Sequence, residues 1–255
     1  MIPKIIHQIW LQGTNYIPDK FTNNIKSIKE NNKDFEYIIW DEIKILELIM
    51  LKKEWVDIYY KFIYIHQKID FAKYVILHVY GGIYIDIDVE IIKSFNDLIE
   101  KYKDYDTIIS ELNIDKFESI VTTGNPKSYN NGIIITKKES IVMKNLINEI
   151  INSYIVPKIF YFKVFLINNT TGPNIFTKII NKNLEYVKIL DSEYLEPCVR
   201  DDCKITENTI AIHRHNLSWM PDDFKNIIDF YLKHKIIFIF VTLIIIYVII
   251  DKLRK

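Results

Sequence analysis

The sequence predicts an α/β domain with a mostly parallel, Rossmann-like sheet flanked by helices, followed by a hydrophobic C-terminal helix. Short β-branched runs bounded by turn residues alternate with longer stretches that have the apolar period of a helix. The length of 255 residues suits one sizeable domain with an appendage. A hydrophobic content of 49% is too high for a disordered chain. Because such sheets bind ligands beyond the carboxyl ends of their strands, functional residues are expected there.

Strands and helices are predicted to alternate along the chain. Asp41 is a suitable N-cap for the helix that follows the second strand. Gly81-Gly82 ends the long helix before the third strand, and Gly172-Pro173 begins a late helix. The predicted strands fall at 2–10, 35–40, 83–89, 107–110, 132–136, 186–190 and 209–213, and the clearest helices at 61–80 and 139–154.

The charge balance excludes one class of partner. Lys and Arg number 33 and Asp and Glu also number 33, so the formal net charge is zero. A general nucleic-acid binder needs excess positive charge to replace phosphate counterions. No nucleic-acid partner is therefore expected.

Cysteine usage is sparse, with Cys198 and Cys203 as the two thiols of the chain. Two thiols are too few for a disulfide framework or a zinc site. We expect both to be reduced on a loop, and one bridge closing a short loop is the alternative.

The segment Ile236–Ile250 carries no charge and is flanked on both sides by lysines. At about 1.5 Å per residue it spans roughly 22 Å, and the flanking lysines can extend to the headgroups of a bilayer. We expect a single-pass membrane anchor, with a buried C-terminal helix as the alternative. The predicted domains are thus 1–230 and 236–250. The N-terminus does not resemble a signal peptide, which favours a cytosolic catalytic domain.

The stretch that carries chemistry contains Asp86 and Asp88. On a strand over 83–89 the two carboxylates share one face with Tyr84 and Glu90, about 7 Å apart. Aspartate is disfavoured in strands, and like charges this close repel each other. A divalent cation such as Mn²⁺ or Mg²⁺ removes both difficulties. The alternative is an edge strand with a solvated acidic face.

Asp70 and Lys73 lie on the helix that leads into this acidic strand. Their spacing of three residues places them on one helix face. They could bind donor hydroxyls beside a metal and diphosphate, or they could form a surface ion pair of little energetic value.

Several segments, taken in chain order, resemble landmarks of glycosyltransferase family 32. The resemblance covers roughly residues 2–220 and implies a GT-A fold, a nucleotide-sugar donor, a Mn²⁺- or Mg²⁺-dependent site and retention at the anomeric carbon. The segments that carry it are Ile2-Pro-Lys-Ile-Ile-His-Gln-Ile-Trp10, Trp40-Asp41, Asp70–Glu90, Asn131-Gly-Ile-Ile-Ile-Thr136, Thr171-Gly-Pro173 and His213…Ser218-Trp219.

The resemblance also implies roles for individual residues. Asp86 and Asp88 would hold the metal, with His213 or Ser218 closing the metal or diphosphate site. Asp70 and Lys73 complete the expected catalytic set. The expected donor-binding set is Trp10, Asp70, Lys73, Tyr84, Asp86, Asn131, Gly172, Pro173 and Trp219. The family usually has arginine where this chain has Lys73, which replaces a planar fork by a point charge.

The sequence therefore predicts a metal-dependent, retaining glycosyltransferase. It would move a hexose from a UDP- or GDP-sugar to a hydroxyl of a glycan, lipid or protein. The Lys73 departure motivates an alternative, a catalytically inactive, membrane-tethered module that binds a nucleotide sugar or glycan. A metal-dependent phosphohydrolase that uses the acidic cluster is a further alternative.

Overall fold

The structure of the chain is a computed structural model that describes residues 1–114, 116, 119–120, 125–156, 163–199, 202–213, 226 and 234. Residues 1–215 form one compact unit. The predictions for segment 236–250, for Ser218 and for Trp219 lie outside the described residues. Among the helices that the structure describes, none combines the length and the apolar composition needed to cross a bilayer.

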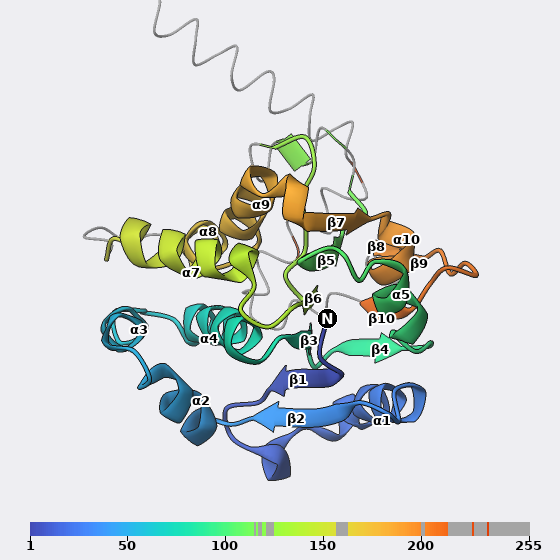
Figure 1. The fold of residues 1–255 in the computed structure, drawn as a ribbon, viewed down its shortest axis with the longest axis horizontal. Coiled ribbons are helices and arrows are strands. Elements are labelled where there is room, and N and C mark those ends of the chain that lie inside the picture. The colour runs from blue at the N-terminus through green and yellow to red at the C-terminus, as the bar shows by residue number, and fades with distance from the viewer. Residues whose placement is uncertain are drawn as a thin grey trace, which may run out of the picture. The chain divides into compact units, whose positions relative to one another are not determined.

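A six-stranded sheet forms the centre of the described fold, in the order β2-β1-β3-β6-β5-β7 (Figure 1). Strand β1 pairs in parallel with β2 and β3, and β5 pairs in parallel with β7, whereas β6 is antiparallel to both of its neighbours. The predicted class is correct, with β6 as the exception to the parallel pattern. The strands are β1 Ile5–Ile9, β2 Glu36–Trp40, β3 Gly82–Ile85, β5 Thr107–Ser110, β6 Ile133–Thr136 and β7 Val187–Leu190.

Two small sheets accompany the central one. Strand β4 (Val89–Ile91) pairs with β10 (Ala211–His213), and β8 (Cys198–Val199) pairs with β9 (Asp202–Cys203). The pairing of β4 with β10 brings a late segment of the chain beside the acidic stretch at Asp88. The described helices are α1 Thr22–Asn31, α2 Glu42–Ile49, α3 Lys53–Tyr59, α4 Ile65–Tyr80, α5 Asn96–Lys101, α7 Ile141–Ser153, α8 Lys163–Thr170, α9 Pro173–Lys182 and α10 Ser192–Leu195, with short 3-10 turns at Thr14–Tyr16, Asp19–Phe21 and Leu184–Tyr186.

Hydrophobic cores lie on both faces of the central sheet because successive strand side chains point to opposite faces. In β6, Ile134 belongs to the core shared with α2, α3, α4, α7 and α9, whereas Ile133 and Ile135 belong to the core shared with α1, α5 and α10. This arrangement of helices on both sides of a sheet explains why a strand such as β6, Ile133–Thr136, has isoleucine on both of its faces.

Local sequence signals set the C-terminal end of α4 as predicted, whereas the helix begins at Ile65 and not at residue 61. Gly81 is its C-cap, with φ +67°, and Gly82 follows with φ +96°. A Cβ on Gly81 would lie 2.4 Å from the Lys138 backbone nitrogen, so the chain also needs glycine here for a close approach. Asp41 is confirmed as an N-cap, since its side chain accepts a hydrogen bond from the Lys44 backbone N–H at 2.9 Å.

The predicted strand over 83–89 is corrected by the structure. Strand β3 ends at Ile85, residues 87–88 form a turn, and β4 begins at Val89. The Val89 N–H donates to the Asp86 carbonyl at 3.2 Å and closes this turn. Aspartate favours turns over strands, so two aspartates in three residues interrupt the strand instead of alternating along it.

The expectation of two reduced thiols is wrong in this structure. Cys198 and Cys203 form a disulfide that closes the β8–β9 hairpin. The antiparallel register places the two residues directly opposite each other, with a Cα–Cα distance of 4.0 Å. The alternative of one bridge that closes a short loop is therefore correct.

His7 of β1 is a buried core histidine. Its Nε2 lies 2.8 Å from the Gly81 carbonyl, and its Nδ1 accepts the Trp40 indole N–H at 3.2 Å. These partners fit a neutral ring with its proton on Nε2. Burial lowers the pKa of His7 to about 4, against a smaller opposing effect of the Gly81 carbonyl.

This lowered pKa predicts an acid-sensitive stability. The unfolded histidine takes up a proton near pH 6.5, whereas the folded ring stays neutral until about pH 4. The contribution of neutral His7 to the free energy of unfolding is therefore fully present above pH 6.5. It falls by about 3 kcal/mol as the pH decreases to 4. We expect the free energy of unfolding of His7→Asn, measured in urea at several pH values, to depend less on pH between 6.5 and 4 than that of the wild type. An unchanged slope between the wild type and the variant would contradict the assignment.

Candidate active site

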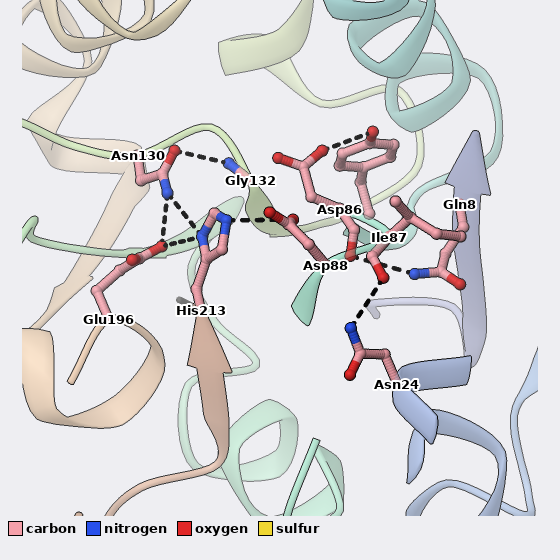
Figure 2. A network of polar contacts seen from close by, with 10 residues as sticks. Gln8, Asn24, Asp86, Ile87, Asp88, Asn130, Gly132, Glu196 and His213 are labelled. Atoms are coloured by element: carbon pink, nitrogen blue, oxygen red, sulfur yellow. Dashed lines mark hydrogen bonds and ion pairs between the residues drawn. The ribbon is translucent and has the colours of Figure 1, made fainter. Parts of the chain in front are cut away.

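The candidate site lies at the carboxyl ends of β1 and β3, where β6 begins. Asp86 directly follows β3, and its backbone N–H donates to the Gly132 carbonyl at 2.8 Å. Gly132 in turn precedes Ile133, the first residue of β6. This is the edge of an α/β sheet at which ligands are expected. Figure 2 shows the polar contacts that gather there.

Two side chains from the N-terminal part of the chain hold the turn that carries the aspartates. The Gln8 amide donates to the Asp86 carbonyl at 3.2 Å, and the Asn24 amide donates to the Ile87 carbonyl at 3.2 Å (Figure 2). Tyr37 donates its hydroxyl proton to the Gln8 amide oxygen and orients that side chain. The turn is thus fixed from β1, α1 and β2 before any ligand binds.

Asp86, Asp88 and His213 form a cluster with the composition of a metal site. One ligand atom from each residue lies within 4.8 Å of the others. His213 Nε2 is 3.3 Å from the Asp88 carboxylate. A Cβ at Gly132 would lie 2.9 Å from both Asp86 Oδ2 and His213 Cε1, so glycine leaves room for these two side chains to converge. Two carboxylates and one imidazole suit a Mn²⁺- or Mg²⁺-like cation.

Glu196 and Asn130 support the other side of the His213 ring. The Glu196 carboxylate is 3.2 Å from His213 Nδ1 and accepts the Asn130 amide at 2.8 Å (Figure 2). Burial alone lowers the pKa of His213, but the carboxylates of Glu196 and Asp88 outweigh it and hold the pKa well above its ordinary value. A carboxylate behind a ligating histidine fixes the ring and its tautomer, leaving Nε2 directed at the cluster.

Neighbouring groups shift the pKa of Asp86 in opposite directions. Burial raises the pKa of Asp86, and the Asp88 charge adds to this effect, whereas Lys73, His213 and a hydrogen bond from Tyr84 lower it. The Tyr84 hydroxyl donates to Asp86 Oδ1 at 2.8 Å. Burial and the nearby Asp86 charge raise the pKa of Tyr84 well above its ordinary value, so this hydroxyl keeps its proton and remains a donor.

Asp70 and Lys73 form a buried ion pair, not the surface pair of the alternative interpretation. Lys73 Nζ lies 2.9 Å from Asp70 Oδ1, and the two side chains are 3% and 12% exposed. The Asn131 amide donates to Asp70 Oδ1 and the Thr171 hydroxyl donates to Asp70 Oδ2, each at 3.1 Å. The Lys73 ammonium also lies 5.1 Å from the centre of the Tyr84 ring, which connects this pair to Asp86.

Residues 18–105 match a family model described as the glycosyltransferase sugar-binding region containing DXD motif. This region includes Asp70, Lys73, Asp86 and Asp88. The chain is a glycosyltransferase that contains this sugar-binding region. The resemblance predicted from the sequence is confirmed, and so is the prediction of an enzyme.

Curated relatives support this assignment over different lengths of the glycosyltransferase. An uncharacterized glycosyltransferase of Acanthamoeba polyphaga mimivirus is 29% identical over 234 residues, which cover 87% of this chain and 85% of the viral protein. Inositol phosphoceramide mannosyltransferase 1 of Schizosaccharomyces pombe is 32% identical over 104 residues, which cover 39% of this chain and 32% of the yeast enzyme. The match thus spans about a third of the yeast enzyme.

Solved structures resemble the glycosyltransferase in fold. The catalytic domain of α-toxin from Clostridium novyi aligns with a TM-score of 0.54 and 13% identity, over 90% of this chain and 82% of the toxin domain. Mouse xyloside xylosyltransferase 1 aligns with a TM-score of 0.50 and 12% identity, over 85% of this chain and 99% of the mouse chain. These likenesses support the GT-A-like fold.

The remaining predicted site residues occupy positions around this edge. Trp10 follows β1, donates its indole N–H to the Tyr16 carbonyl at 3.1 Å and packs 5.9 Å from the Phe21 ring. Gly172 and Pro173 begin α9, directly after Thr171, which binds Asp70. Ser218 and Trp219 lie outside the described residues, so their predicted roles stay predictions.

Sequence reasoning missed the residues that hold the Asp86–Asp88 turn, Asp70 and His213 in position. Single polar residues inside apolar strands were a usable signal for Gln8, and an Asn-Gly dipeptide before a strand was one for Gly132. No local sequence pattern marked Glu196, because its contact with His213 joins two residues that are distant in the sequence. The missed residues are Gln8, Asn24, Asn130, Gly132, Thr171 and Glu196.

Proposed function

We propose that this glycosyltransferase moves a hexose from a nucleotide-diphosphate sugar to an acceptor hydroxyl, depends on a divalent cation and retains the anomeric configuration. The observation that carries the proposal is the convergence of Asp86, Asp88 and His213 at the ligand-binding edge of the sheet. Tyr84 connects the ion pair of Asp70 and Lys73 to this cluster, because its ring contacts Lys73 and its hydroxyl donates to Asp86. Acidic, imidazole and ammonium groups side by side suit a metal, a diphosphate and sugar hydroxyls together.

Asp86, Asp88 and His213 are the residues that would hold Mn²⁺ or Mg²⁺. When bound, such a cation neutralises the charge that develops on the leaving diphosphate. The Lys73 ammonium adds positive potential near the same group. Asp70 is fixed by donors from Asn131 and Thr171, which leaves it oriented toward hydroxyls of the donor sugar.

The reaction breaks the bond between the anomeric carbon and the diphosphate oxygen and forms a bond to the acceptor oxygen. The acceptor proton passes to the leaving diphosphate when attack occurs on the face from which that group departs. This front-face course retains the anomeric configuration. Every group that the site supplies then acts on charge and position, which is the main requirement for such a transfer.

The donor and acceptor follow from the named relatives as a proposal. The fission-yeast relative is an inositol phosphoceramide mannosyltransferase by name, which favours a mannosyl donor and a phosphoinositol lipid acceptor. UDP-hexoses remain in the donor panel, since pocket contacts that decide the sugar lie on loops.

The test uses the full chain with Mn²⁺ or Mg²⁺ and a panel of UDP- and GDP-sugars. We expect metal-dependent release of nucleoside diphosphate from one donor, faster in the presence of a hydroxyl acceptor. Proton NMR of the product then reads the anomeric configuration, and an inverted product would contradict retention. Tight donor binding without any release would overturn the transferase proposal in favour of a binding module. Turnover of nucleotides that lack a sugar would indicate a phosphohydrolase.

The position of Glu196 predicts an effect on metal affinity. Replacing Glu196 by Gln keeps the side-chain size but removes the charge that orients and polarises His213. We expect Glu196→Gln to weaken Mn²⁺ binding by about 10- to 100-fold, measured by calorimetry. Glu193→Gln is the matched control, because Glu193 contacts Thr206 and Asn208 instead. Equal Mn²⁺ affinity in both variants would show that Glu196 does not position the ligand.

A further inference from the structure

A group of large apolar side chains is exposed beside the active site. Tyr60, Ile63 and Ile65 precede or begin α4. Ile155 and Val156 follow the end of α7, and Phe165 lies on α8. Their exposed fractions run from 46% to 79%. Single exposed apolar residues are ordinary, but six gathered from two segments need an explanation. We call this set the α4–α8 face.

Contacts between the two segments show that these residues share one side of the molecule. The Tyr154 hydroxyl donates to the Lys61 carbonyl at 3.3 Å, and the Tyr154 ring packs 5.0 Å from the Phe62 ring. Lys163 Nζ lies 5.9 Å from the centre of the Tyr64 ring. Helices α3, α4, α7 and α8 also lie on one side of the ribbon (Figure 1).

Within the two segments that form this face, every formal charge is positive. Lys61, Lys68 and Lys163 lie among its apolar residues, and the sequence has no Asp or Glu at 58–69 or at 150–184. Lys68 Nζ lies 5.2 Å from the centre of the Tyr59 ring, so its stem covers apolar surface while its ammonium stays outside. Because the formal charges of the whole chain sum to zero, the rest of the chain carries a net negative charge. Aromatic, aliphatic and lysine side chains without carboxylates are the composition of a surface that rests at a bilayer interface.

Both segments run from this face into the active site. Ile65 and Asp70 are five residues apart on α4, which is about 7.5 Å of helix rise. On the other segment, Phe165 is followed by Thr170, bonded to Gln67 at 2.7 Å, and by Thr171, bonded to Asp70. A surface that supports the α4–α8 face would therefore lie next to Asp70 and its polar partners.

We propose that the α4–α8 face docks on an anionic lipid bilayer and presents the site to an acceptor carried by that bilayer. The role for the acceptor rests on the proposed function, whereas the docking itself does not. A bilayer fits better than a protein partner because lysines are interspersed with the exposed apolar side chains in both segments.

The test follows individual positions of the full chain, so that contacts made by any other segment do not decide it. An environment-sensitive fluorophore is attached to Ile63→Cys or Phe165→Cys, which replace side chains 52% and 54% exposed. Leu184→Cys and Tyr105→Cys are controls, 52% and 37% exposed, which precede β7 and β5 and so lie at the amino ends of these strands, opposite the site.

We expect vesicles of phosphatidylcholine and phosphatidylserine to shift the emission of the labels at 63 and 165 to the blue. Brominated acyl chains should quench these two labels and spare those at 105 and 184. Four labels that respond alike, or no response at 63 and 165, would overturn the proposal. Insertion of the labels in a chain that shows no sugar transfer would refute only the proposed function.

A charge variant tests the electrostatic part. Lys61→Glu, Lys68→Glu and Lys163→Glu together should reduce the vesicle-induced response at position 165 by about tenfold or more in apparent affinity. The control combines Lys33→Glu, Lys103→Glu and Lys204→Glu, which make the same change of net charge outside the face. Equal losses in both sets would show that net charge, and not this face, governs binding.

Discussion

Replacing Asp88 by Asn is expected to lower nucleoside diphosphate release by about 10²- to 10³-fold. Asp88 contributes a carboxylate to the cluster with Asp86 and His213 and lies 3.3 Å from the imidazole. The amide keeps the size of the side chain but removes the negative charge that a divalent cation needs. Both donor turnover and Mn²⁺ binding should therefore fall together, the first measured by diphosphate release and the second by electron paramagnetic resonance.

The stability of the Asp88→Asn variant separates this effect from misfolding. Removing Asp88 relieves its repulsion with Asp86 but also removes its ion pair with His213, so the two effects offset each other and the urea midpoint should change little. Asp97→Asn is the control, since Asp97 is exposed in the first turn of α5. Full activity in Asp88→Asn, or an equal loss in Asp97→Asn, would remove Asp88 from the metal site.

Replacing Lys73 by Met is expected to destabilise the fold by about 3–5 kcal/mol. The ammonium is 2.9 Å from Asp70 and almost fully buried, so the variant leaves a buried carboxylate without its countercharge. Asn131 and Thr171 still donate to that carboxylate, but neutral donors do not replace the lost charge. Urea unfolding at neutral pH measures the loss, and donor turnover should fall as well, because Asp70 shifts.

A double variant shows whether the loss comes from the unpaired charge. Asp70→Asn combined with Lys73→Met removes both charges and should recover part of the stability lost in Lys73→Met. Lys178→Met serves as a control. Its ion pair with Glu149 has a similar distance, 2.6 Å, but the lysine side chain is 53% exposed, so we expect a loss of less than about 1 kcal/mol. A double variant as unstable as the single one would argue against coupling between Asp70 and Lys73.

Replacements of Asp88 and of Lys73 are expected to differ in their effects on turnover and on stability. Asp88 lies on the open side of the cluster, with its side chain 18% exposed, so its loss should affect turnover more than stability. Lys73 lies inside, under Tyr84 and Asp70, so its loss should affect both. We therefore expect the charge of Lys73 to be required for stability as well as for turnover.

Local signals in the sequence determined much of the α/β class before any contact was known. Alternating apolar runs predicted the order of strands and helices, and Gly81-Gly82 and Asp41 marked element ends, because caps and turns depend on neighbouring residues. The pattern Asp86-x-Asp88, together with Asp70 and Lys73, also marked the site, since so many charges in an apolar region need a chemical reason.

The tertiary structure alone decided how these residues meet. The antiparallel insertion of β6, the turn in place of a strand at Asp86–Asp88 and the Cys198–Cys203 bridge depend on pairing between separate segments. Glu196 reaches His213 across 17 positions of sequence, and Asn131 reaches Asp70 across 61. Such contacts follow from the packing of the whole chain, which local periodicity does not encode. Burial likewise made the pair of Asp70 and Lys73 structural, because burial is a property of the fold and not of the spacing.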